Sequence, residues 1–220
     1  MPKDYFKPSV TVDIILFSII NEEIKVLLIR RGIPPFKGMW AIPGGFVREK
    51  EELEDAAKRE LSEETGVNVS YLEQLYTFGG INRDPRGRVI TITYFGLTAL
   101  EQTLQASTDA EHARWFSIKK LPSLAFDHKN ILEYALQRLR WKFEYTTVAF
   151  SVLPEKFTLT SLQRLYEVVF DKPFDKRNFR KKLFSLKIVE PTKEIDRNVS
   201  HRPPQFYKFV GKIGDIKEMV

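Results

Sequence analysis

The sequence has no cysteine and no long apolar run, and its first residues do not resemble a leader. Without cysteine the chain forms no disulfide and offers no thiolate to a metal, which fits a reducing cytoplasm. The apolar stretch at residues 14–20 is far too short to span a bilayer, so we expect no membrane association. Met-Pro-Lys-Asp at the start contains an acid and precedes no apolar core with a cleavage site, so we expect no signal peptide.

The remaining composition is that of an ordinary soluble globular protein. The 220 residues are 43% hydrophobic and 29% charged, enough for one large or two modest domains. The net charge of +6 is unevenly distributed, because residues 143–220 hold 15 Lys/Arg against 10 Asp/Glu. This positive excess in the last third favours a surface that binds an anionic partner.

An amphipathic helix is predicted in the middle of the first half of the chain. Leu53, Ala56, Ala57 and Leu61 recur at helical spacing, and Gly66 stands where a left-handed cap residue belongs. Before this helix, an apolar run at residues 39–42 leads into a tight Gly-Gly turn at 44–45.

Three carboxylates crowd one face of this predicted helix. Glu60, Glu63 and Glu64 stand at i, i+3 and i+4, where like charges repel. A hard divalent cation removes that repulsion, because Mg²⁺ or Mn²⁺ takes carboxylate oxygens and leaves positions for phosphate and water. Arg59 is placed to pair with Glu51 and hold the preceding loop to the helix. The alternative is a solvated acidic helix.

The whole stretch resembles the Nudix box, the signature of the Nudix hydrolase family. The residues that match its pattern are Gly45, Glu51, Arg59-Glu60-Leu61, Glu63-Glu64 and Gly66-Val67. The resemblance implies an α/β/α sandwich with a mixed sheet and Mg²⁺-dependent hydrolysis of a nucleoside diphosphate linked to another group. It also implies that Glu60, Glu63 and Glu64 hold the metal, with the Gly45 carbonyl as a further ligand and Glu51 and Arg59 as supports.

The elements expected around the box complete such a domain over residues 1–145. Strands are expected at residues 10–20, 24–31, 39–42, 71–79, 89–97 and 114–117, and a closing helix at 128–142. Candidate ligand contacts are basic residues at a strand end, in a polar turn and at a helix start: Arg30, Arg31, Arg83, Arg86, Arg88 and His128. Each has a plain alternative as an exposed charge or, for the histidine, a structural cap residue.

The proton acceptor for hydrolysis is left open between two sources. One is Glu60 itself. The other is an additional carboxylate in the acidic segment at residues 101–113, as in relatives of the Nudix family, with Glu111 as the first candidate and Glu101 and Asp109 as the others.

Residues 146–220 predict a winged helix-turn-helix. A helix capped by Thr160, a second helix at 176–186 opened by Asp175, and strands at 188–190 and 205–210 follow that order. From Lys172 to Lys187 there are seven basic residues and one acid. The residues expected to reach bases and phosphates are Lys176, Arg177, Asn178, Arg180 and Lys181, joined by Arg197, His201 and Arg202 of the wing.

The combination resembles the Nudix-related transcriptional regulators, which include repressors of NAD metabolism and regulators of sugar catabolism. That resemblance implies a cytoplasmic homodimer that binds a small molecule such as ADP-ribose in the Nudix domain and double-stranded DNA with the winged helix. Many such regulators have a degraded box, whereas this one is intact, so hydrolysis is expected alongside sensing. Two alternatives stand: a plain ADP-ribose or nucleoside diphosphate sugar pyrophosphatase whose C-terminal domain only dimerises, and a sensor without turnover.

Overall fold

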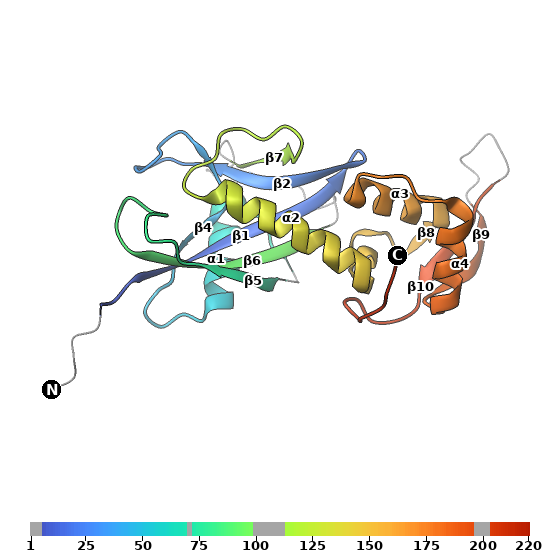
Figure 1. Ribbon diagram of the computed structural model, residues 1–220. Coiled ribbons are helices and arrows are strands. Elements are labelled where there is room, and N and C mark those ends of the chain that lie inside the picture. Colours follow the sequence, from blue (N-terminus) through green and yellow to red (C-terminus); the bar gives the residue numbers. More distant parts are fainter. Residues whose placement is uncertain (1–5, 70–71, 99–112, 196–202) are drawn as a thin grey trace. The chain divides into compact units, whose positions relative to one another are not determined.

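The computed structural model describes residues 6–69, 72–98, 113–195 and 203–220, and Figure 1 shows the path of the chain. The chain divides into two units. The first comprises Met1–Ser18 and Lys25–Ala135, and the second comprises Ile19–Ile24 and Leu136–Val220. Within the described ranges, no helix is both long and apolar enough to cross a membrane.

A mixed sheet forms the first unit. In the part of the chain that the structure describes it has seven strands in the order β3-β2-β1-β6-β5, with β4 paired to β1 and β7 to β2. Strands β1 and β6 are parallel, whereas β4 pairs antiparallel with β1, β3 and β7 with β2, and β5 with β6. The strands are β1 (Ser9–Ile20), β2 (Glu23–Arg30), β3 (Trp40–Ala41), β4 (Gly44–Phe46), β5 (Glu73–Phe78), β6 (Val89–Thr98) and β7 (Ala113–Ser117).

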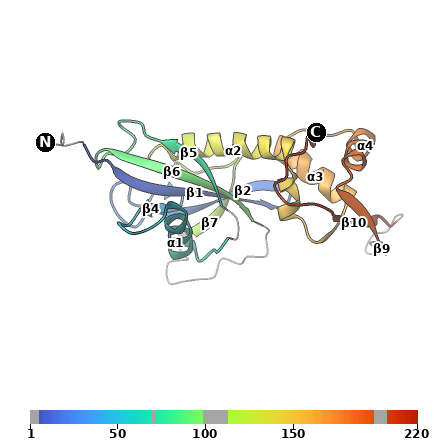
Figure 2. The same cartoon turned by 90° about the horizontal axis from the view of Figure 1, so that it is seen from below.

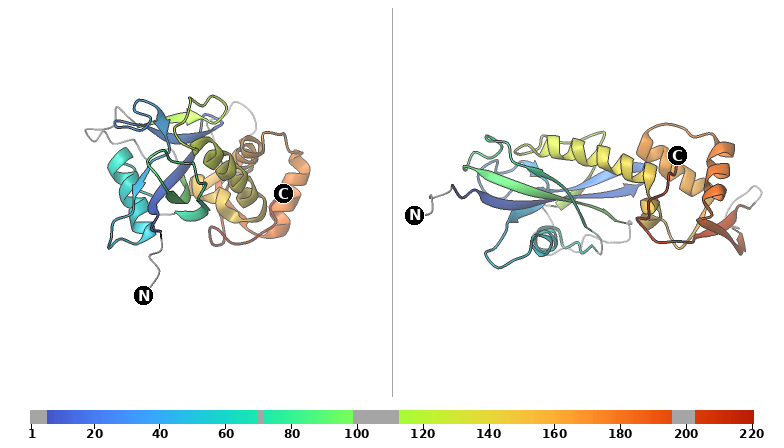
Figure 3. Two further views of the ribbon diagram at one scale, coloured as in Figure 1. Left: turned by 60° about the vertical axis from the view of Figure 1, so that its left-hand side comes forward. Right: turned by 60° about the horizontal axis from the view of Figure 1, so that its bottom comes forward.

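Helices cover both faces of this sheet. Helix α1 (Leu53–Thr65) lies against one face, and the first part of α2 (His128–Tyr145), residues 128–135, lies against the other, as Figures 2 and 3 show. Residues 11–18 of β1 are consecutively buried, which is expected of a central strand that is packed on both sides. The predicted α/β/α sandwich with a mixed sheet is therefore confirmed.

Helix α1 presents its small and apolar side chains to the sheet. Ala56, Ala57 and Leu61 are buried in one cluster with Val12 and Ile14 of β1. The helix ends at Gly66, whose φ of 68° is left-handed and whose N–H donates to the Ser62 carbonyl at 2.9 Å. The predicted glycine cap is confirmed.

The second unit contains a small antiparallel sheet and two consecutive helices. The sheet has the order β8-β10-β9. Its elements are η2 (Thr147–Val152), β8 (Lys156–Thr158), α3 (Leu159–Phe170), α4 (Lys176–Leu186), β9 (Val189–Ile195) and β10 (Gln205–Phe209). The turn between β1 and β2 is grouped with this unit, where Glu22 accepts a hydrogen bond from Arg164 of α3 at 2.7 Å.

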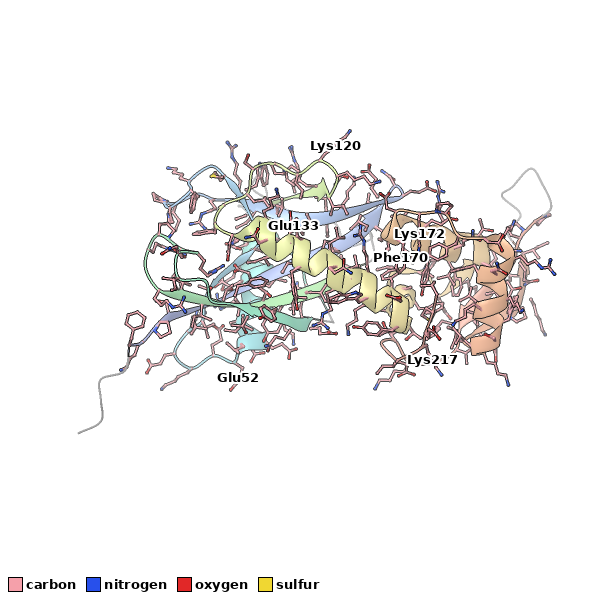
Figure 4. All side chains as sticks on the ribbon, viewed as in Figure 1. Glu52, Lys120, Glu133, Phe170, Lys172 and Lys217 are labelled. Atoms are coloured by element: carbon pink, nitrogen blue, oxygen red, sulfur yellow. The ribbon has the colours of Figure 1, made fainter. Side chains whose placement is uncertain are left out.

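Tyr166 of α3 is at the centre of an aromatic core in the second unit. Its ring lies 5.4 Å from Phe143 and 5.3 Å from Phe179, measured between centroids, in edge-on contacts. Lys172, labelled with Phe170 in Figure 4, lies over the rings of Phe170 and Phe174. These ring contacts connect α3 to α4 and fix the angle at which α4 leaves the turn.

The start of α3 differs from the prediction. The cap is Thr158, not Thr160: the Thr158 hydroxyl accepts from the Ser161 N–H, and the Ser161 hydroxyl accepts from the Thr158 N–H. This reciprocal pair satisfies two amides at once, whereas a helix opened at Thr160 would leave the earlier turn unsatisfied. The cap of α4 is Asp175 as predicted, accepting from the Asn178 N–H at 2.8 Å.

Candidate ligand and metal site

The Gly44-Gly45 turn lies directly against the carboxylates of α1. Strand pairing places Gly44 opposite Asp13 and Gly45 opposite Val12 of β1. The Gly44 N–H donates to Glu64 Oε2 at 2.8 Å. A Cβ on Gly45 would lie 2.5 Å from Glu60 Cδ, so only glycine permits this approach of backbone to carboxylate.

Arg59 links the acidic side chains and the loop. It binds Glu51 through two hydrogen bonds of 2.6 and 2.9 Å, and its Nη1 donates to Glu60 at 2.6 Å and to Glu63 at 3.2 Å. Its Nη2 also donates to the Phe46 carbonyl at 3.3 Å. The guanidinium therefore acts as an internal counter-ion that holds the loop before α1 to the helix.

Glu64 is largely buried and lies near two other carboxylates, those of Glu60 and Asp13. Burial raises its pKa first, and the charges of Glu60 and Asp13 add to that, bringing the pKa to about 8 against the opposing Gly44 hydrogen bond. A cation placed here would relieve the same repulsion.

The donor chemistry of this face fits a hard divalent ion. Glu60, Glu63, Glu64 and Gly45 line one cavity and offer only oxygen ligands, which Mg²⁺ and Mn²⁺ prefer. Within the described ranges no three acidic or histidine side chains already converge on one metal position. Arg59 occupies oxygens of Glu60 and Glu63, so a cation would compete with it for them.

The cavity has a volume of about 530 Å³ and is lined by both acidic and basic groups. Asp13 and Asp84 join the glutamates on the acidic side. The lining also includes most of the predicted ligand contacts and several apolar side chains: Arg30, Arg31, Arg83, Arg86, His128, Thr11, Ile29, Ile33, Ile42, Phe46 and Phe126. A ligand with phosphates, hydroxyls and an apolar ring has complementary groups for every part of this wall.

Arg83 is buried within a network of charges. It binds Asp127 through two hydrogen bonds of 3.0 and 2.8 Å and lies 3.5 Å from Asp13, with its side chain only 5% exposed. This arginine fixes the start of α2 against the sheet and lines the cavity as part of its wall. Arg88, by contrast, donates to the carbonyls of Gly79 and Gly80 and is not among the lining residues.

Arg86 and Arg31 are partly exposed inside the cavity. The Arg86 guanidinium makes three hydrogen bonds to Asp84, of 3.0, 3.2 and 2.6 Å. They hold the pKa of that carboxyl below its usual value although burial opposes ionisation. Arg31 donates to the Pro35 carbonyl at 2.8 Å, and burial lowers its pKa. Arg30 donates to the Gly38 carbonyl at 3.1 Å and is exposed at the end of β2.

His128 is a buried neutral side chain. Its Nδ1 accepts the Ile42 N–H at 2.9 Å, so the proton is on Nε2, which lies 3.9 Å from Asp13. Burial lowers its pKa, which keeps it uncharged at neutral pH. The imidazole therefore holds the backbone at Ile42, the residue after β3, and lies beside Asp13.

Asp13, Asp84, Phe46 and Phe126 were not predicted as parts of the site. Asp13 offered one signal, since it is a lone carboxylate in the apolar run of β1. The three remaining positions carried no sequence signal of this kind. The candidate proton acceptors Glu101, Asp109 and Glu111 lie outside the described residues, as do Arg197, His201 and Arg202 of the wing.

The predicted DNA-contacting residues are on one helix of the second unit. Lys176, Arg177, Asn178 and Lys181 of α4 are exposed, whereas Phe179 and Leu183 on the opposite side are buried. Arg180 is half-buried, and its Nε has no hydrogen-bond partner in the described part of the chain. An exposed basic face on the second helix, with the β9–β10 ribbon after it, is the arrangement of a helix-turn-helix recognition helix and its wing.

Glu51 makes the stability of the loop before α1 depend on pH. The hydrogen bonds from Arg59 lower the pKa of Glu51 to about 2. The stabilisation is present above the unfolded value, about 4.3, and is lost as the pH falls towards the folded value. Wild type and Glu51→Gln should therefore differ in unfolding free energy at pH 7 and converge near pH 2 in urea titrations.

The matched control for this prediction is Glu52→Gln. Glu52 is exposed and makes no side-chain cap hydrogen bond, so this variant should follow the wild type across the same pH range. A difference between wild type and Glu51→Gln that stays constant from pH 7 to 2 would contradict the assignment.

Comparison with known proteins identifies the class of both units. The NUDIX domain model matches residues 9–138, and the model of the NrtR DNA-binding winged helix domain matches residues 149–209. The chain therefore belongs to the Nudix family and carries a winged helix domain of the NrtR type.

Individual relatives are similar over most of the chain. The ADPR responsive transcriptional repressor NtrR of Acinetobacter baylyi is 38% identical over 210 residues, 94% of this chain and 84% of the relative. The ADP-ribose pyrophosphatase of Methanocaldococcus jannaschii is 42% identical over 138 residues, 63% of this chain and 77% of that protein. The crystal structure of Shewanella oneidensis NrtR with a 27mer DNA superposes with a TM-score of 0.80 at 35% identity, over 91% of this chain and 93% of that one.

Proposed function

We propose that this chain is a transcriptional repressor whose Nudix unit binds ADP-ribose and whose winged helix binds operator DNA. The observation that carries the proposal is the similarity over 94% of the chain to an ADPR responsive repressor. The exposed basic face of α4 and the similarity to a DNA-bound NrtR structure support the DNA contact. A plain pyrophosphatase would not need such a surface.

The cavity supplies groups for each part of ADP-ribose. Glu60, Glu63 and Glu64 would hold a divalent ion, with Mg²⁺ as our proposal, and the bound ion would neutralise phosphate charge. Arg30 and Arg86 are the guanidinium groups placed to bind phosphate oxygens. We further propose that the protein works in the cytoplasm as a homodimer, since helix-turn-helix dimers read paired half-sites.

The test measures DNA binding by fluorescence anisotropy, with labelled DNA from the region upstream of the gene's own operon. We expect a specific complex whose affinity falls steeply with salt and which ADP-ribose weakens. Arg177→Ala should weaken binding at least about 5-fold, whereas Lys120→Ala, an exposed lysine of the first unit, should not. The absence of any specific complex at low salt would exclude the repressor function.

Hydrolysis is a second proposed activity of the same unit. It is favoured by the complete set of Gly45, Glu60, Glu63 and Glu64 and by the similarity to an ADP-ribose pyrophosphatase. Water attacks one phosphorus of the diphosphate, the P–O bond to the other phosphate breaks, and AMP and ribose 5-phosphate are released. Glu60, or a carboxylate of the segment at residues 101–113, takes the proton of the attacking water.

Turnover is measured as AMP released from ADP-ribose with Mg²⁺ or Mn²⁺ present. Glu63→Gln is expected to lower the rate by about 10–100-fold or more. Glu54→Gln is the control, because Glu54 pairs with Lys58 on an exposed part of the same helix and does not line the cavity. A wild-type chain that binds ADP-ribose without releasing AMP would be a sensor only, and the repressor proposal would stand unchanged.

A further inference from the structure

The turn between α3 and α4 is held by the carboxylate of Glu167. Its Oε1 accepts the Phe174 N–H at 3.1 Å and a hydrogen bond from the Gln163 side-chain amide at 3.0 Å. The same amide donates to the Phe174 carbonyl at 2.9 Å. Both polar groups of the Phe174 backbone, one residue before the Asp175 cap of α4, are therefore bonded to side chains of α3.

The main chain of Glu167 holds the beginning of the same turn. Its carbonyl accepts the N–H of Asp171, whose φ of 52° is left-handed, and the N–H of Lys172 at 3.3 Å. Side chain and main chain of this residue thus fix the turn at both ends. The direction in which α4 starts depends on them.

Arg164 connects the Glu167 carboxylate to the turn between β1 and β2. Its Nη1 lies 3.4 Å from Glu167 Oε2, and its Nη2 lies 2.7 Å from Glu22 Oε2. Asn21 and Glu22 have left-handed φ angles of 51° and 59°, which a tight hairpin turn requires at its two central residues. Glu22 is therefore presented to α3 by a defined turn, and we call Glu22, Arg164 and Glu167 the ion-pair chain.

The hairpin formed by β1 and β2 also contributes to the ligand cavity. Residues of both strands line it: Thr11 and Asp13 of β1, and Ile29 and Arg30 of β2. Both strands run without a break from these residues to the turn, which is grouped with the second unit. A movement of the strands at the cavity is therefore carried to Glu22 by continuous backbone.

We propose that Glu167 is a positioning residue for DNA binding and that Glu22 and Arg164 couple it to the β1–β2 hairpin. The inference rests on the proposed function, since it assigns the contacts through which ADP-ribose in the first unit weakens DNA binding by α4. With the ion-pair chain intact, the turn is held and α4 keeps the direction that DNA requires. A hairpin displaced by ligand separates Glu22 from Arg164 and releases the turn.

The first test measures the DNA affinity of the full chain by fluorescence anisotropy without ligand. Glu167→Ala should weaken binding by about 5- to 10-fold, although loss of a negative charge by itself strengthens binding to DNA. Glu167→Gln keeps an oxygen for the Phe174 N–H and should recover most of the affinity. Gln163→Ala removes the other side-chain bond to Phe174 without changing the charge, so it should also weaken binding.

The matched control for the first test is Glu155→Ala. Glu155 is an exposed carboxylate of the second unit, placed before β8 and outside the turn between α3 and α4. This variant should bind DNA at least as tightly as the wild type, because only its charge differs. Thermal melting verifies that every variant is folded.

The second test measures DNA affinity with and without saturating ADP-ribose. Glu22→Gln should weaken binding by about 2- to 5-fold without ligand and leave the affinity with ligand unchanged, because the ligand has already separated the pair. Glu23→Gln is the matched control, since Glu23 is the exposed carboxylate next in the chain and should behave as wild type. Calorimetry verifies that both variants bind ADP-ribose as the wild type does.

The outcomes separate this inference from the proposed function. Glu167→Ala with wild-type DNA affinity would overturn the positioning role and leave the repressor function intact. Equal weakening by Glu22→Gln with and without ADP-ribose would overturn the coupling. A wild type whose DNA complex ignores ADP-ribose would overturn the proposed effector and the coupling together, and one that forms no specific complex would overturn the repressor function and the whole inference.

Discussion

Arg83→Ala should lower the free energy of unfolding by about 3–5 kcal/mol. The substitution removes the charge that neutralises Asp127 and Asp13, both of which are largely shielded from water. Breaking a buried ion pair from one side leaves an uncompensated charge, which costs more than the pair contributed. Urea denaturation of the full chain, followed by tryptophan fluorescence, measures the change.

A control variant and a double-mutant cycle separate the cost of leaving a buried charge unpaired from the cost of simply removing an arginine. Arg88→Ala removes an arginine of the same loop that, within the described ranges, binds uncharged carbonyls, so it should cost about 1 kcal/mol. Asp127→Asn combined with Arg83→Ala should cost less than the sum of the single substitutions, because the two side chains interact directly. Additive costs would show that Arg83 acts through packing and not through its charge.

Gly44→Ala should lower the stability of the fold, whereas Gly45→Ala should weaken binding, although the two residues are adjacent. A Cβ on Gly44 would overlap the Val12 carbonyl and lie 2.9 Å from Asp13 Cα, both backbone atoms of the central strand. Relief requires movement of β1 or β4, so we expect a loss of about 1–3 kcal/mol in unfolding free energy, towards the upper end.

For Gly45 the obstacle is the carboxylate of Glu60, the mobile end of a side chain. Gly45→Ala should therefore keep most of its stability and lose the proposed binding of Mg²⁺ and ADP-ribose, because Glu60 is pushed out of place. Thermal melting and calorimetric titration of both variants measure the two effects. Equal destabilisation by both substitutions would contradict the view that only Gly44 is constrained by backbone.

Local sequence signals explain why helices α1 and α4 could be predicted. Helix α4 begins and ends as predicted, since Asp175 caps it and Phe179 and Leu183 repeat at core spacing. Helix α1 is similarly defined by its alanine and leucine spacing and by Gly66. At α3 two threonines compete as caps, and the choice of Thr158 depends on its reciprocal bonds with Ser161.

The ligand site was harder to predict than the helices, because its geometry depends on contacts between residues that are distant in sequence. Arg83, Arg86 and Arg88 are close in sequence and chemically alike, yet Arg83 is buried in an ion-pair network of the cavity wall, Arg86 is partly exposed inside the cavity and Arg88 binds loop carbonyls. The hairpin that carries them places each side chain against a different neighbour. Spacing along the chain contains no information about those neighbours.

The sequence by itself determined the family, the two-domain order and the acidic face of α1, because these follow from residue type at fixed local spacing. Only the tertiary structure decided that Asp13, Phe46 and Phe126 line the cavity. These features join residues far apart in the chain, and their energies arise from burial and charge that exist only once the sheet has formed.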